Sequence, residues 1–486
     1  LGEAKSEKLL TEAAVDFGVD PKAELWKLPS QFVGPYAEQD ARLAFDLYKF
    51  FRIEINKENL ETVFDLETRL TPCLIDMTFK GIRVDMEKCE RTKQELLKRE
   101  KVLLKKIKEM AGQDVEIWAA ASLSKAFDKL KIKYARTGTG QPSFTKSFLS
   151  ENPHEFAKLV VQARNLNKIQ GTFVTSIMKY VSKEGRIHGH INQLRSDGGG
   201  TVSGRLSMAN PNLQQIPARD PELGPLIRSL FLPEEGEQWA AVDFSQQEPR
   251  ILTHYASVFG EWKGSPLGGA QEFVDAYTND PETDFHTMVA EMAQIPRKQA
   301  KTINLGMMYG MGVKKLSEQL DLEIDEAKSL TEQYHSRVPF VKQLMSGVSR
   351  SVDKKEDGSI RSLKGRKCRF NLFEPLGYEL KKAMPKKEAK AAYGDTTPLR
   401  RAFTYKALNR LIQASAADMT KQAMVDLYEA GERPLLQVHD ELGCSVRDLA
   451  HAKRIKEVME NAIELRVPNK CDIDLGPSWG ETEEIK

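Results

Sequence analysis

The sequence predicts a mixed α/β (α+β) fold of several domains, and three features support this. Two short apolar runs, at 239–243 and 435–440, each end at an acidic residue, which is typical of buried strands. Other segments carry apolar residues at helical spacing, as at 85–112. The 486 residues leave room for about two to four domains, without an apolar run of the roughly eighteen residues that a membrane span needs. We therefore expect a soluble globular protein with no membrane partner.

The two apolar runs place Asp243 and Asp440 at their ends, 197 positions apart (440 − 243). If the strands lie side by side, the carboxylates come within a few ångström, where their repulsion is on the order of several kcal/mol. Two divalent cations about 3.5–4 Å apart would neutralise this charge and stabilise an in-line phosphoryl transfer. A lone aspartate at a strand end is usually an ordinary turn residue, so the hypothesis depends on the pair and on the segment between them.

That segment carries Arg297, Lys301, Leu305 and Tyr309 at intervals of four residues. On a helix these side chains form one stripe, cationic at one end and apolar or aromatic at the other. A nucleoside triphosphate has the same polarity, so the cations can bind phosphates while the apolar end lies against the base and the template. A solvated amphipathic helix explains the segment equally well when it is taken alone.

The distribution of charge and the cysteine content further restrict the class of protein. The net charge is only +2, but residues 80–191 hold 23 Lys and Arg against 12 Asp and Glu, a local +11 (23 − 12). Such a block suits a polyanion, although a solvated helical face explains any single lysine. The odd number of cysteines, five, lacks paired metal-ligand spacing, so we expect neither zinc nor disulfides and a reducing compartment. No signal segment is visible, but the first residue is Leu1, so the native N-terminus cannot be judged.

Several ordered motifs resemble those of one known family. The segments Asp243-Phe-Ser-Gln-Gln-Glu-Pro-Arg250, 297–310 and Gln437-Val-His-Asp-Glu441 resemble motifs A, B and C of family A DNA polymerases, the group of bacterial DNA polymerase I and many phage replicases. The resemblance extends to Ser203-Gly-Arg-Leu-Ser207, 210–217, 365–367 and 476–481, and so covers essentially the whole chain.

The resemblance implies a right-hand polymerase with an antiparallel-sheet palm, helical fingers and a helical thumb. The expected order is a truncated 3′–5′ exonuclease-like remnant at 1–60, the thumb with a palm-entry segment at 61–190, the first palm part at 191–253, the fingers at 254–345 and the second palm part at 346–486. Within the thumb we expect helices over 85–112, stopped by Gly112, and over 154–181, with a flexible tip at 137–142. These helices can follow the DNA backbone along the minor groove without reading sequence. Residues 260–285, rich in Gly, Pro, Asp and Thr, are expected to be a loop elaboration.

The first sixty residues resemble only the end of a proofreading exonuclease. Tyr36 and Asp40, followed by a helix over 41–51, match its last motif. Residues 1–35 contain no Asp-x-Glu to hold the exonuclease metals. We therefore expect no proofreading by this chain, and metal-dependent degradation of single-stranded DNA would contradict this.

The implied activity is that of a DNA-directed DNA polymerase, which adds dNTPs to a primer 3′-hydroxyl and releases pyrophosphate. Two Mg²⁺ ions, replaceable by Mn²⁺, are expected on Asp243, Asp440 and the carbonyl of Phe244. Lys301 and Arg297 would neutralise the leaving pyrophosphate, with Lys301 as a proton donor. Glu441 is expected near the metals in a catalytic role rather than as a direct ligand. The fingers helix would rotate closed on nucleotide binding, with Tyr309 leaving the template position.

Two further sets of side chains follow from the resemblance. The dNTP-binding set is Arg297, Lys301, Leu305, Tyr309, Glu248, His286 and Gln246. As a lone histidine, His286 can equally be a capping or core residue. Minor-groove donors can test base-pair geometry without reading sequence, because every Watson–Crick pair presents acceptors there. The DNA-binding set expected to do so is Arg205, Asn212, Gln214, Asn409, Gln413 and His439. For Asn212 and Asn409, turn or capping hydrogen bonds are a strong alternative.

Two positions refine the expected substrate. Glu248 would pack under the incoming sugar and clash with a 2′-hydroxyl, which favours DNA over RNA synthesis; single-subunit RNA polymerases carry a small residue there. Leu305 departs from the Phe or Tyr of most cellular relatives, which suggests poor dideoxynucleotide acceptance and a phage or viral origin.

The expected partners are a primer-template duplex and dNTPs, and the expected state is a monomer in the cytoplasm of a bacterial cell or phage-infected host. The sequence identifies no replisome partner. The alternative from another class is a DNA-binding scaffold without chemistry, which loss of a metal aspartate would indicate. Both aspartates are present.

Overall fold

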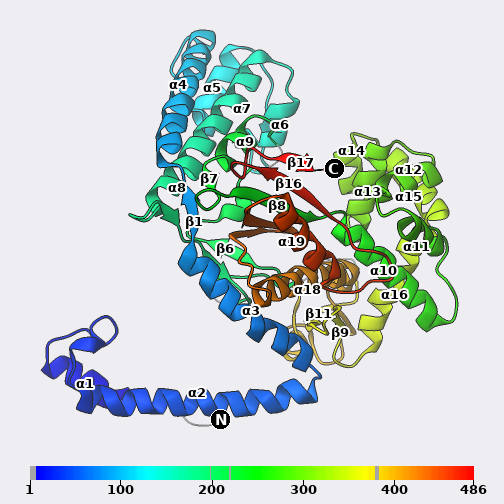
Figure 1. Ribbon diagram of the computed structural model, residues 1–486. Helices are drawn as coiled ribbons and strands as arrows, with labels where there is room; N and C mark the ends of the chain where they lie inside the picture. Colours follow the sequence, from blue (N-terminus) through cyan, green and yellow to red (C-terminus); the bar gives the residue numbers. More distant parts are fainter. Residues whose placement is uncertain (1–6, 197–198, 218–219, 378–381, 486) are drawn as a thin grey trace. The chain divides into compact units, whose positions relative to one another are not determined.

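The computed structural model describes residues 7–196, 199–217, 220–377 and 382–485 (Figure 1). The chain divides into two units, one comprising Leu1–Leu66 with Lys364–Lys367 and the other Glu67–Leu363 with Cys368–Lys486. Helices and antiparallel strands are both abundant, so the mixed α/β prediction is confirmed. None of the helices in the described ranges has the length and apolar character needed to cross a bilayer.

The first unit is helical in its described part. It contains α1 (Lys8–Asp16), a 3₁₀ turn η1 (Leu25–Lys27) and α2 (Ser30–Lys57), while α3 (Glu61–Lys80) begins in this unit and continues in the second. Leu10, Ala13, Ala14 and Leu28 form a small core, against which Tyr36 packs. The helix predicted over 41–51 is confirmed as part of α2, and the interpretation of this unit as an exonuclease remnant stays a prediction.

The central sheet of the second unit has five antiparallel strands in the order β14-β15-β8-β16-β17 (Figure 1). Their bounds are β14 Leu436–Val438, β15 Glu441–Val446, β8 Gln238–Phe244, β16 Cys471–Gly476 and β17 Glu483–Ile485. Trp239 to Val242 of the central strand β8 are all buried. Helix α19 (Leu449–Asn461) packs against β8 and β16. The two predicted apolar runs are therefore strands of one sheet.

The pairing of these strands differs from the prediction in one respect. The run ending at Asp440 does not lie beside β8, because β14 pairs with β15 and β15 pairs with β8. A two-residue turn, His439 and Asp440, reverses the chain, and His439 has a φ of 59°. Left-handed residues favour such tight hairpins because they match the twist of the strands. Asp440 thus reaches the end of β8 from a turn.

The segment predicted as the thumb is mainly helical, and both predicted helices are confirmed (Figure 1). Helix α4 starts after an N-cap in which Asp85 accepts a hydrogen bond from the Lys88 N–H at 2.8 Å, and it ends at Gly112, where φ is 61°. The predicted tip at 137–142 is the turn of a small hairpin, β2–β3. The helices are α4 (Met86–Ala111), α5 (Ala120–Lys129), α6 (Lys146–Glu151), α7 (Glu155–Lys168), the π-helix η2 (Ile169–Val174) and α8 (Thr175–Tyr180), and the strands β2 (Ala135–Arg136) and β3 (Pro142–Ser143).

Short strands connect this segment to the central sheet. One three-stranded sheet has the order β4-β1-β7, and β5 pairs with β6. Their bounds, with the intervening helices, are β1 Ile82–Val84, β4 Arg186–Ile187, β5 His190–Asn192, β6 Ser207–Ala209, η3 Leu213–Gln215, α9 Leu223–Arg228 and β7 Phe231–Leu232.

Seven helices follow β8, and one of them corrects a prediction. Residues 260–285 are not a loop elaboration, because they contain the end of α10, all of α11 and the start of α12. Phe273 and Tyr277 are fully buried on α11, an apolar i, i+4 pair within a polar, Gly- and Pro-flanked composition. The helices are α10 (Gln247–Lys263), α11 (Ala270–Asn279), α12 (Phe285–Ala293), α13 (Arg297–Met308), α14 (Val313–Leu320), α15 (Ile324–Arg337) and α16 (Pro339–Lys354).

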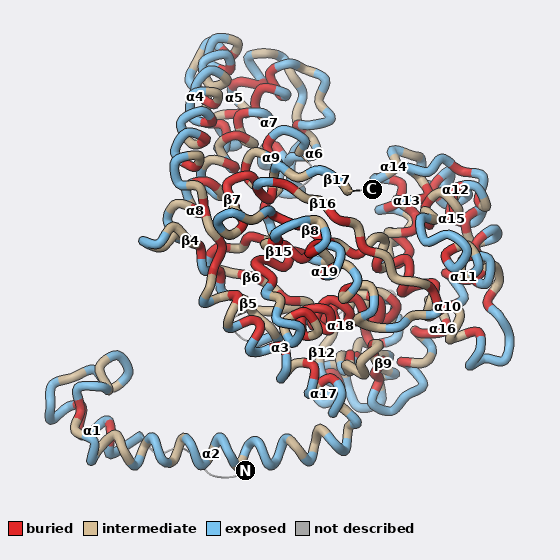
Figure 2. The backbone as a smooth tube through the Cα atoms, in the orientation of Figure 1, coloured by how far each residue is buried: buried red, intermediate tan, exposed pale blue. Residues whose placement is uncertain are grey.

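A second small sheet, β12-β11-β13, precedes the long helix α18. Helix α18 is buried along most of its length, and it shows as a red helix below the central sheet in Figure 2. The elements here are β9 (Ser359–Arg361), β10 (Lys367–Arg369), β11 (Leu372–Pro375), β12 (Met384–Pro385), α17 (Lys386–Tyr393), β13 (Leu399–Arg401), η4 (Thr404–Lys406) and α18 (Ala407–Glu429).

Candidate active site

Asp243 and Asp440 lie at the same end of the central sheet. Asp243 is in register with Glu441 on one side and with Asp472 on the other. The Phe244 N–H donates to the backbone carbonyl of Asp440 at 3.3 Å, which ties the hairpin turn to the end of β8. The structure therefore brings together two aspartates that are 197 positions apart in the sequence (440 − 243).

The electrostatics of this pair indicate a site for cations. Burial, followed by repulsion from Asp440 and Asp472, raises the pKa of Asp243 to about 7. Burial also raises the pKa of Asp440. Within the described ranges, no Lys, Arg or His forms an ion pair with either carboxylate. Two ionised carboxylates at this position raise the free energy of the folded protein unless a cation binds between them.

The donor set fits a hard divalent ion. Two carboxylates and the nearby backbone carbonyl of Phe244 supply oxygen ligands of the kind that Mg²⁺ or Mn²⁺ takes. Among the residues that the structure describes, no group of three or more His, Cys, Asp or Glu side chains is placed to hold a metal ion. The site would therefore need further oxygens, and substrate phosphates can provide them.

Glu441 has partners of its own. The indole N–H of Trp479 donates to Glu441 Oε1 at 2.7 Å, and Arg228 Nη1 lies 4.0 Å from Oε2. Arg228 also lies over the Trp479 ring, with its Cζ 4.4 Å from the ring centroid, and Trp479 stacks on Trp239. Burial raises the pKa of Glu441 in spite of these two donors. Neither Trp479 nor Arg228 was predicted as a site residue, although Trp479 lies in the terminal motif at 476–481.

The predicted stripe on α13 is solvent-facing. Arg297, Lys301 and Tyr309 are exposed and Leu305 is half-buried, while the opposite face of the helix is buried. Lys301 forms no ion pair with any described residue. Arg297 Nη2 pairs with Asp284 Oδ2 at 2.6 Å. Burial would raise the pKa of Asp284, but hydrogen bonds from Arg297 and Thr287 outweigh this and hold it at about 2.

His286 lies in a buried hydrogen-bond chain. Asn304 Nδ2 donates to His286 Nδ1 at 3.0 Å, and the Tyr334 hydroxyl donates to Asn304 Oδ1 at 2.8 Å. Burial lowers the pKa of His286 to about 4, so the ring is neutral at pH 7. These contacts favour the core alternative for His286, and its phosphate contact stays a prediction.

Gln246 has a clear structural task. Gln246 has a backbone φ of 52° and stands directly before α10. Its Nε2 donates to the Thr283 carbonyl at 3.0 Å, and its Oε1 accepts from the Phe285 N–H at 2.8 Å. The side chain thus fixes the start of α12 against the end of motif A, and its dNTP contact stays a prediction.

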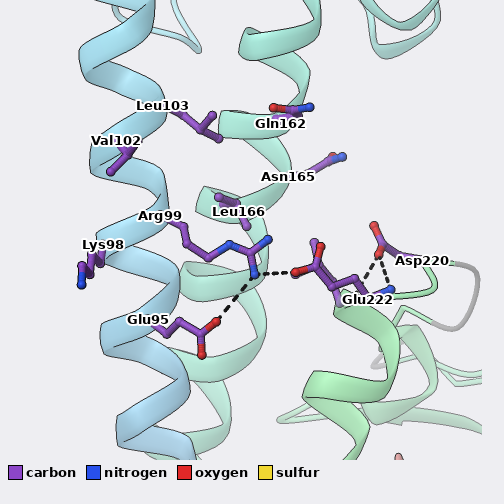
Figure 3. A pocket seen from close by; sticks show the side chains of 11 residues that line it. Glu95, Lys98, Arg99, Val102, Leu103, Gln162, Asn165, Leu166, Asp220 and Glu222 are labelled. Atoms are coloured by element: carbon purple, nitrogen blue, oxygen red, sulfur yellow. Dashed lines mark hydrogen bonds and ion pairs between the residues drawn. The ribbon is translucent and has the colours of Figure 1, made fainter.

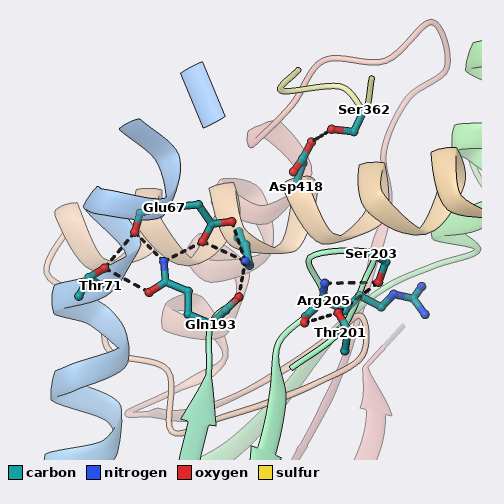
Figure 4. A network of polar contacts seen from close by, with 9 residues as sticks. Glu67, Thr71, Gln193, Thr201, Ser203, Arg205, Ser362 and Asp418 are labelled. Carbon is teal, nitrogen blue, oxygen red and sulfur yellow. Dashed lines mark hydrogen bonds and ion pairs between the residues drawn. The ribbon is translucent and has the colours of Figure 1, made fainter. Parts of the chain in front are cut away.

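Glu248 joins two other predicted site residues. Arg205 Nη2 pairs with Glu248 Oε1 at 2.5 Å, and the Tyr309 hydroxyl donates to Glu248 Oε2 at 2.9 Å. Figure 4 shows how the backbone of Arg205 is held: the Thr201 hydroxyl donates to its carbonyl at 2.8 Å. The structure therefore clusters a predicted DNA contact, the predicted sugar selector and the predicted template-side tyrosine.

The other predicted DNA contacts border this cluster. Asn212 caps the 3₁₀ turn η3 by accepting from the Gln214 N–H at 3.1 Å, which is the alternative considered for it. Gln214 Nε2 donates to Gln437 Oε1 at 3.0 Å, next to the Asp440 turn. His439 is exposed within that turn. Asn409 and Gln413, four residues apart, share one face of α18.

A separate pocket lies between α4, α7 and α9 (Figure 3). Its volume is about 650 Å³. Arg99 crosses it to pair with Glu222 at 2.7 Å and lies 3.8 Å from Glu95. None of the predicted site residues lines it, so it adds nothing to the carboxylate site.

The raised pKa of Asp243 gives a stability prediction. Its folded pKa of about 7 exceeds its ordinary value of 3.8, so ionisation opposes folding, and this cost grows as pH rises through that window. Without divalent metal, Asp243→Asn should raise the free energy of unfolding at pH 8 by about 2–4 kcal/mol. Thermal unfolding in EDTA measures this. The gain should shrink at pH 5, and Mg²⁺ should stabilise only the wild type; equal stability of both proteins at pH 8 in EDTA would contradict the account.

Acidic residues that meet at one end of an antiparallel sheet are typical of enzymes of two-metal phosphoryl transfer, a class that includes polymerases and nucleases. The model of DNA polymerase family A matches residues 86–481, and the chain belongs to this family. It is 36% identical to a DNA-directed DNA polymerase of Pseudomonas phage M6, over 98% of this chain and 75% of the relative. It is 31% identical to DNA polymerase DpoZ of Salmonella phage PMBT28, over 94% and 76%. DNA polymerase I of Geobacillus stearothermophilus is 31% identical over 85% of this chain but only 45% of that longer protein.

A solved structure agrees. The POL domain of Pol1 from M. smegmatis, in complex with DNA primer-template and dNTP, matches with a TM-score of 0.75 and 26% identity, over 98% of this chain and 79% of that one. The predicted polymerase fold is thus confirmed. The individual roles of the predicted site residues are not tested by this similarity.

Proposed function

We propose that this chain extends a primer 3′-hydroxyl with dNTPs, directed by a template strand, and releases pyrophosphate. The observation that carries the proposal is the Asp243–Asp440 pair at the end of the sheet, with which no described Lys or Arg forms an ion pair. Helix α13, which carries the exposed cations, has its C-cap at Tyr309, and the Tyr309 hydroxyl donates to Glu248 at the start of α10. The similar M. smegmatis domain was solved with the same substrate classes. Primer extension by the purified chain with Mg²⁺ and dNTPs tests it, and failure to elongate any annealed oligonucleotide would overturn it.

The metal-binding residues would be Asp243, Asp440 and the carbonyl of Phe244. Bound as a pair, Mg²⁺ ions lower the pKa of an attacking hydroxyl and stabilise charge on a leaving phosphate. Side chains of the protein would bind the triphosphate. Lys301, without an ion-pair partner among described residues, is ready to meet the triphosphate, and its ammonium can donate a proton to the leaving pyrophosphate. Arg297 must exchange Asp284 for phosphate oxygens.

Tyr309, Glu248 and Arg205 would change partners at the same time. Tyr309 now donates to Glu248, so its departure from the template position breaks that hydrogen bond. Glu248 would then face the incoming sugar, and Arg205 the minor groove at the primer end. This exchange belongs to the proposed closing motion of α13.

The non-catalytic scaffold alternative receives no support from the site. A scaffold has no need for two adjacent carboxylates whose pKa values burial raises and with which no described Lys or Arg forms an ion pair. We further propose two Mg²⁺ ions, replaceable by Mn²⁺, and action in the cytoplasm of a bacterial cell or phage-infected host, in line with the phage relatives.

Leu305 yields a prediction about sugar analogues. It is half-buried on the exposed face of α13, one turn before Tyr309. Leu305→Tyr should raise dideoxynucleotide incorporation about tenfold relative to dNTP, because the ring adds stacking and its hydroxyl can replace the missing 3′-hydroxyl. Single-nucleotide incorporation kinetics give the kcat/KM ratio. Leu305→Phe is the control, with a ring but no hydroxyl, and should gain little; an unchanged ratio in the tyrosine variant would remove Leu305 from this role.

A further inference from the structure

A basic and aromatic surface adjoins the template end of α13, outside the predicted site. We call Lys386, Lys387, Lys390, Phe403, Tyr405 and Lys406 the basic-aromatic surface; all six are exposed. Described residues 382–410 hold eight Lys and Arg against two Asp and Glu, a local +6 (8 − 2). The surface lies on α17, the end of β13 and η4.

The lysines of α17 share one face of the helix. Lys386 and Lys390 are four residues apart, Lys387 and Lys390 are three apart, and all three are exposed, while Ala389 is buried. Like charges at this spacing destabilise a helix. No carboxylate of the described residues pairs with any of the three. Ion pairs within the described residues therefore do not explain the clustering of these lysines, and the cluster suits a polyanion.

A chain of contacts connects α17 to α13. Helix α17 packs on β11 and on β12, and Figure 2 labels α17 next to β12. Lys386 Nζ lies 5.7 Å from the centroid of the Phe373 ring. Phe373 is in register with Arg401 at the end of β13, after which the chain continues to Phe403 and Tyr405. Lys406 Nζ lies 5.1 Å from the Phe403 ring centroid and 5.5 Å from that of Tyr405.

The surface ends directly beside Tyr309. A β-carbon added to Gly310 would lie 3.1 Å from the Tyr405 ring, so the Gly310 backbone is in contact with that ring. Exposed rings flanked by cations form a stacking platform for unpaired bases, and the cations hold the phosphates between them. A duplex would hide its bases from such rings.

We propose that the basic-aromatic surface binds the single-stranded template ahead of the primer end. This rests on the proposed function and adds to it a path for the strand that has not yet been copied. The phosphates would follow the α17 lysines, and the bases nearest Tyr309 would stack on Tyr405 and Phe403.

The test is equilibrium binding of the full chain to two primer-templates that share one duplex. One has a single-nucleotide template overhang, and the other an overhang of about ten nucleotides. The triple variant Lys386→Ala, Lys387→Ala, Lys390→Ala should bind the long overhang about tenfold more weakly than the wild type and the short one equally. For the long overhang, the slope of the logarithm of the binding constant against the logarithm of the salt concentration should become shallower by about two. Each phosphate contact on a single strand contributes about 0.7 to this slope, and three lysines are removed.

Two controls isolate the effect. Lys453→Ala with Arg454→Ala removes exposed cations from α19 and should change neither affinity, and the triple Lys→Arg variant should keep wild-type binding. Equal affinities of the triple alanine variant and the wild type for the long overhang, in a chain that extends primers, would overturn this inference alone. An equal loss of affinity for both primer-templates would show that the surface binds the duplex, and this result would also overturn the inference. A wild type that neither binds nor extends primer-template would instead refute the proposed function.

Discussion

Asp440→Ala should reduce primer extension at least about 10³-fold, the largest effect expected of any single change in this chain. The carboxylate lies in the two-residue turn that meets the end of β8, and nothing else in the turn can replace its oxygens. Loss of a metal ligand removes several kcal/mol of transition-state stabilisation, and about 4 kcal/mol corresponds to this factor. Single-turnover extension of an annealed primer with saturating dNTP and Mg²⁺ measures it.

The matched control is Asp474→Ala. Asp474 is half-buried on the neighbouring strand β16 but is in register with Ala241, two residues before Asp243. It contributes negative charge to the sheet without reaching the site, so its removal should leave the rate within a few-fold. DNA affinity in EDTA should not fall in Asp440→Ala, because the variant removes a charge that repels phosphates. A variant that still extends primers at a comparable rate would refute the metal-site hypothesis.

Much of the candidate site could be predicted from the sequence because local sequence patterns encode it. A short apolar run that ends at an acidic residue predicted the strand with Asp243, and the four-residue recurrence predicted the exposed face of α13. The strand β15 was missed, because Gly443 and Ser445 interrupt its apolar character. Helix α11 was missed because turn-forming residues flank its two apolar anchors.

Partners that depend on tertiary packing were beyond sequence reasoning. The pairing of Arg297 with Asp284 requires α12 and α13 to meet at their N-terminal ends, which no local pattern encodes. The contact of Trp479 with Glu441 joins the last strands of the chain to motif C. Spacing in the sequence can place a side chain on one face of a helix or strand, but it cannot identify the residue that pairs with it or hydrogen-bonds to it.

These partners have a functional consequence. Arg297, Tyr309, Arg205 and Glu248, all predicted to meet substrate, here bind one another or Asp284. Substrate binding must therefore replace ion pairs and hydrogen bonds that already exist, and only interactions that differ between the two arrangements can drive closure. Lys301 has no such partner among described residues, so it can attract the triphosphate before the exchange.

Glu248→Ala should raise the ratio of ribonucleotide to deoxynucleotide incorporation by about 10–100-fold. The wild-type side chain is half-buried and held by Arg205 and Tyr309, so it presents a fixed wall where a 2′-hydroxyl would lie. Exclusion of one hydroxyl by shape is worth about 1–3 kcal/mol, which corresponds to this range. The measurement is kcat/KM for matched rNTP and dNTP on one primer-template.

Glu248→Gln separates shape from charge. Glutamine keeps the volume of the side chain but loses the ion pair with Arg205, so it should retain most of the discrimination against ribonucleotides while weakening the contact that holds the wall. If both variants relax selectivity equally, the charge that orders the side chain is responsible rather than its bulk. If neither does, Glu248 has no part in sugar selection, and its contacts with Arg205 and Tyr309 serve only to hold the cluster before substrate arrives.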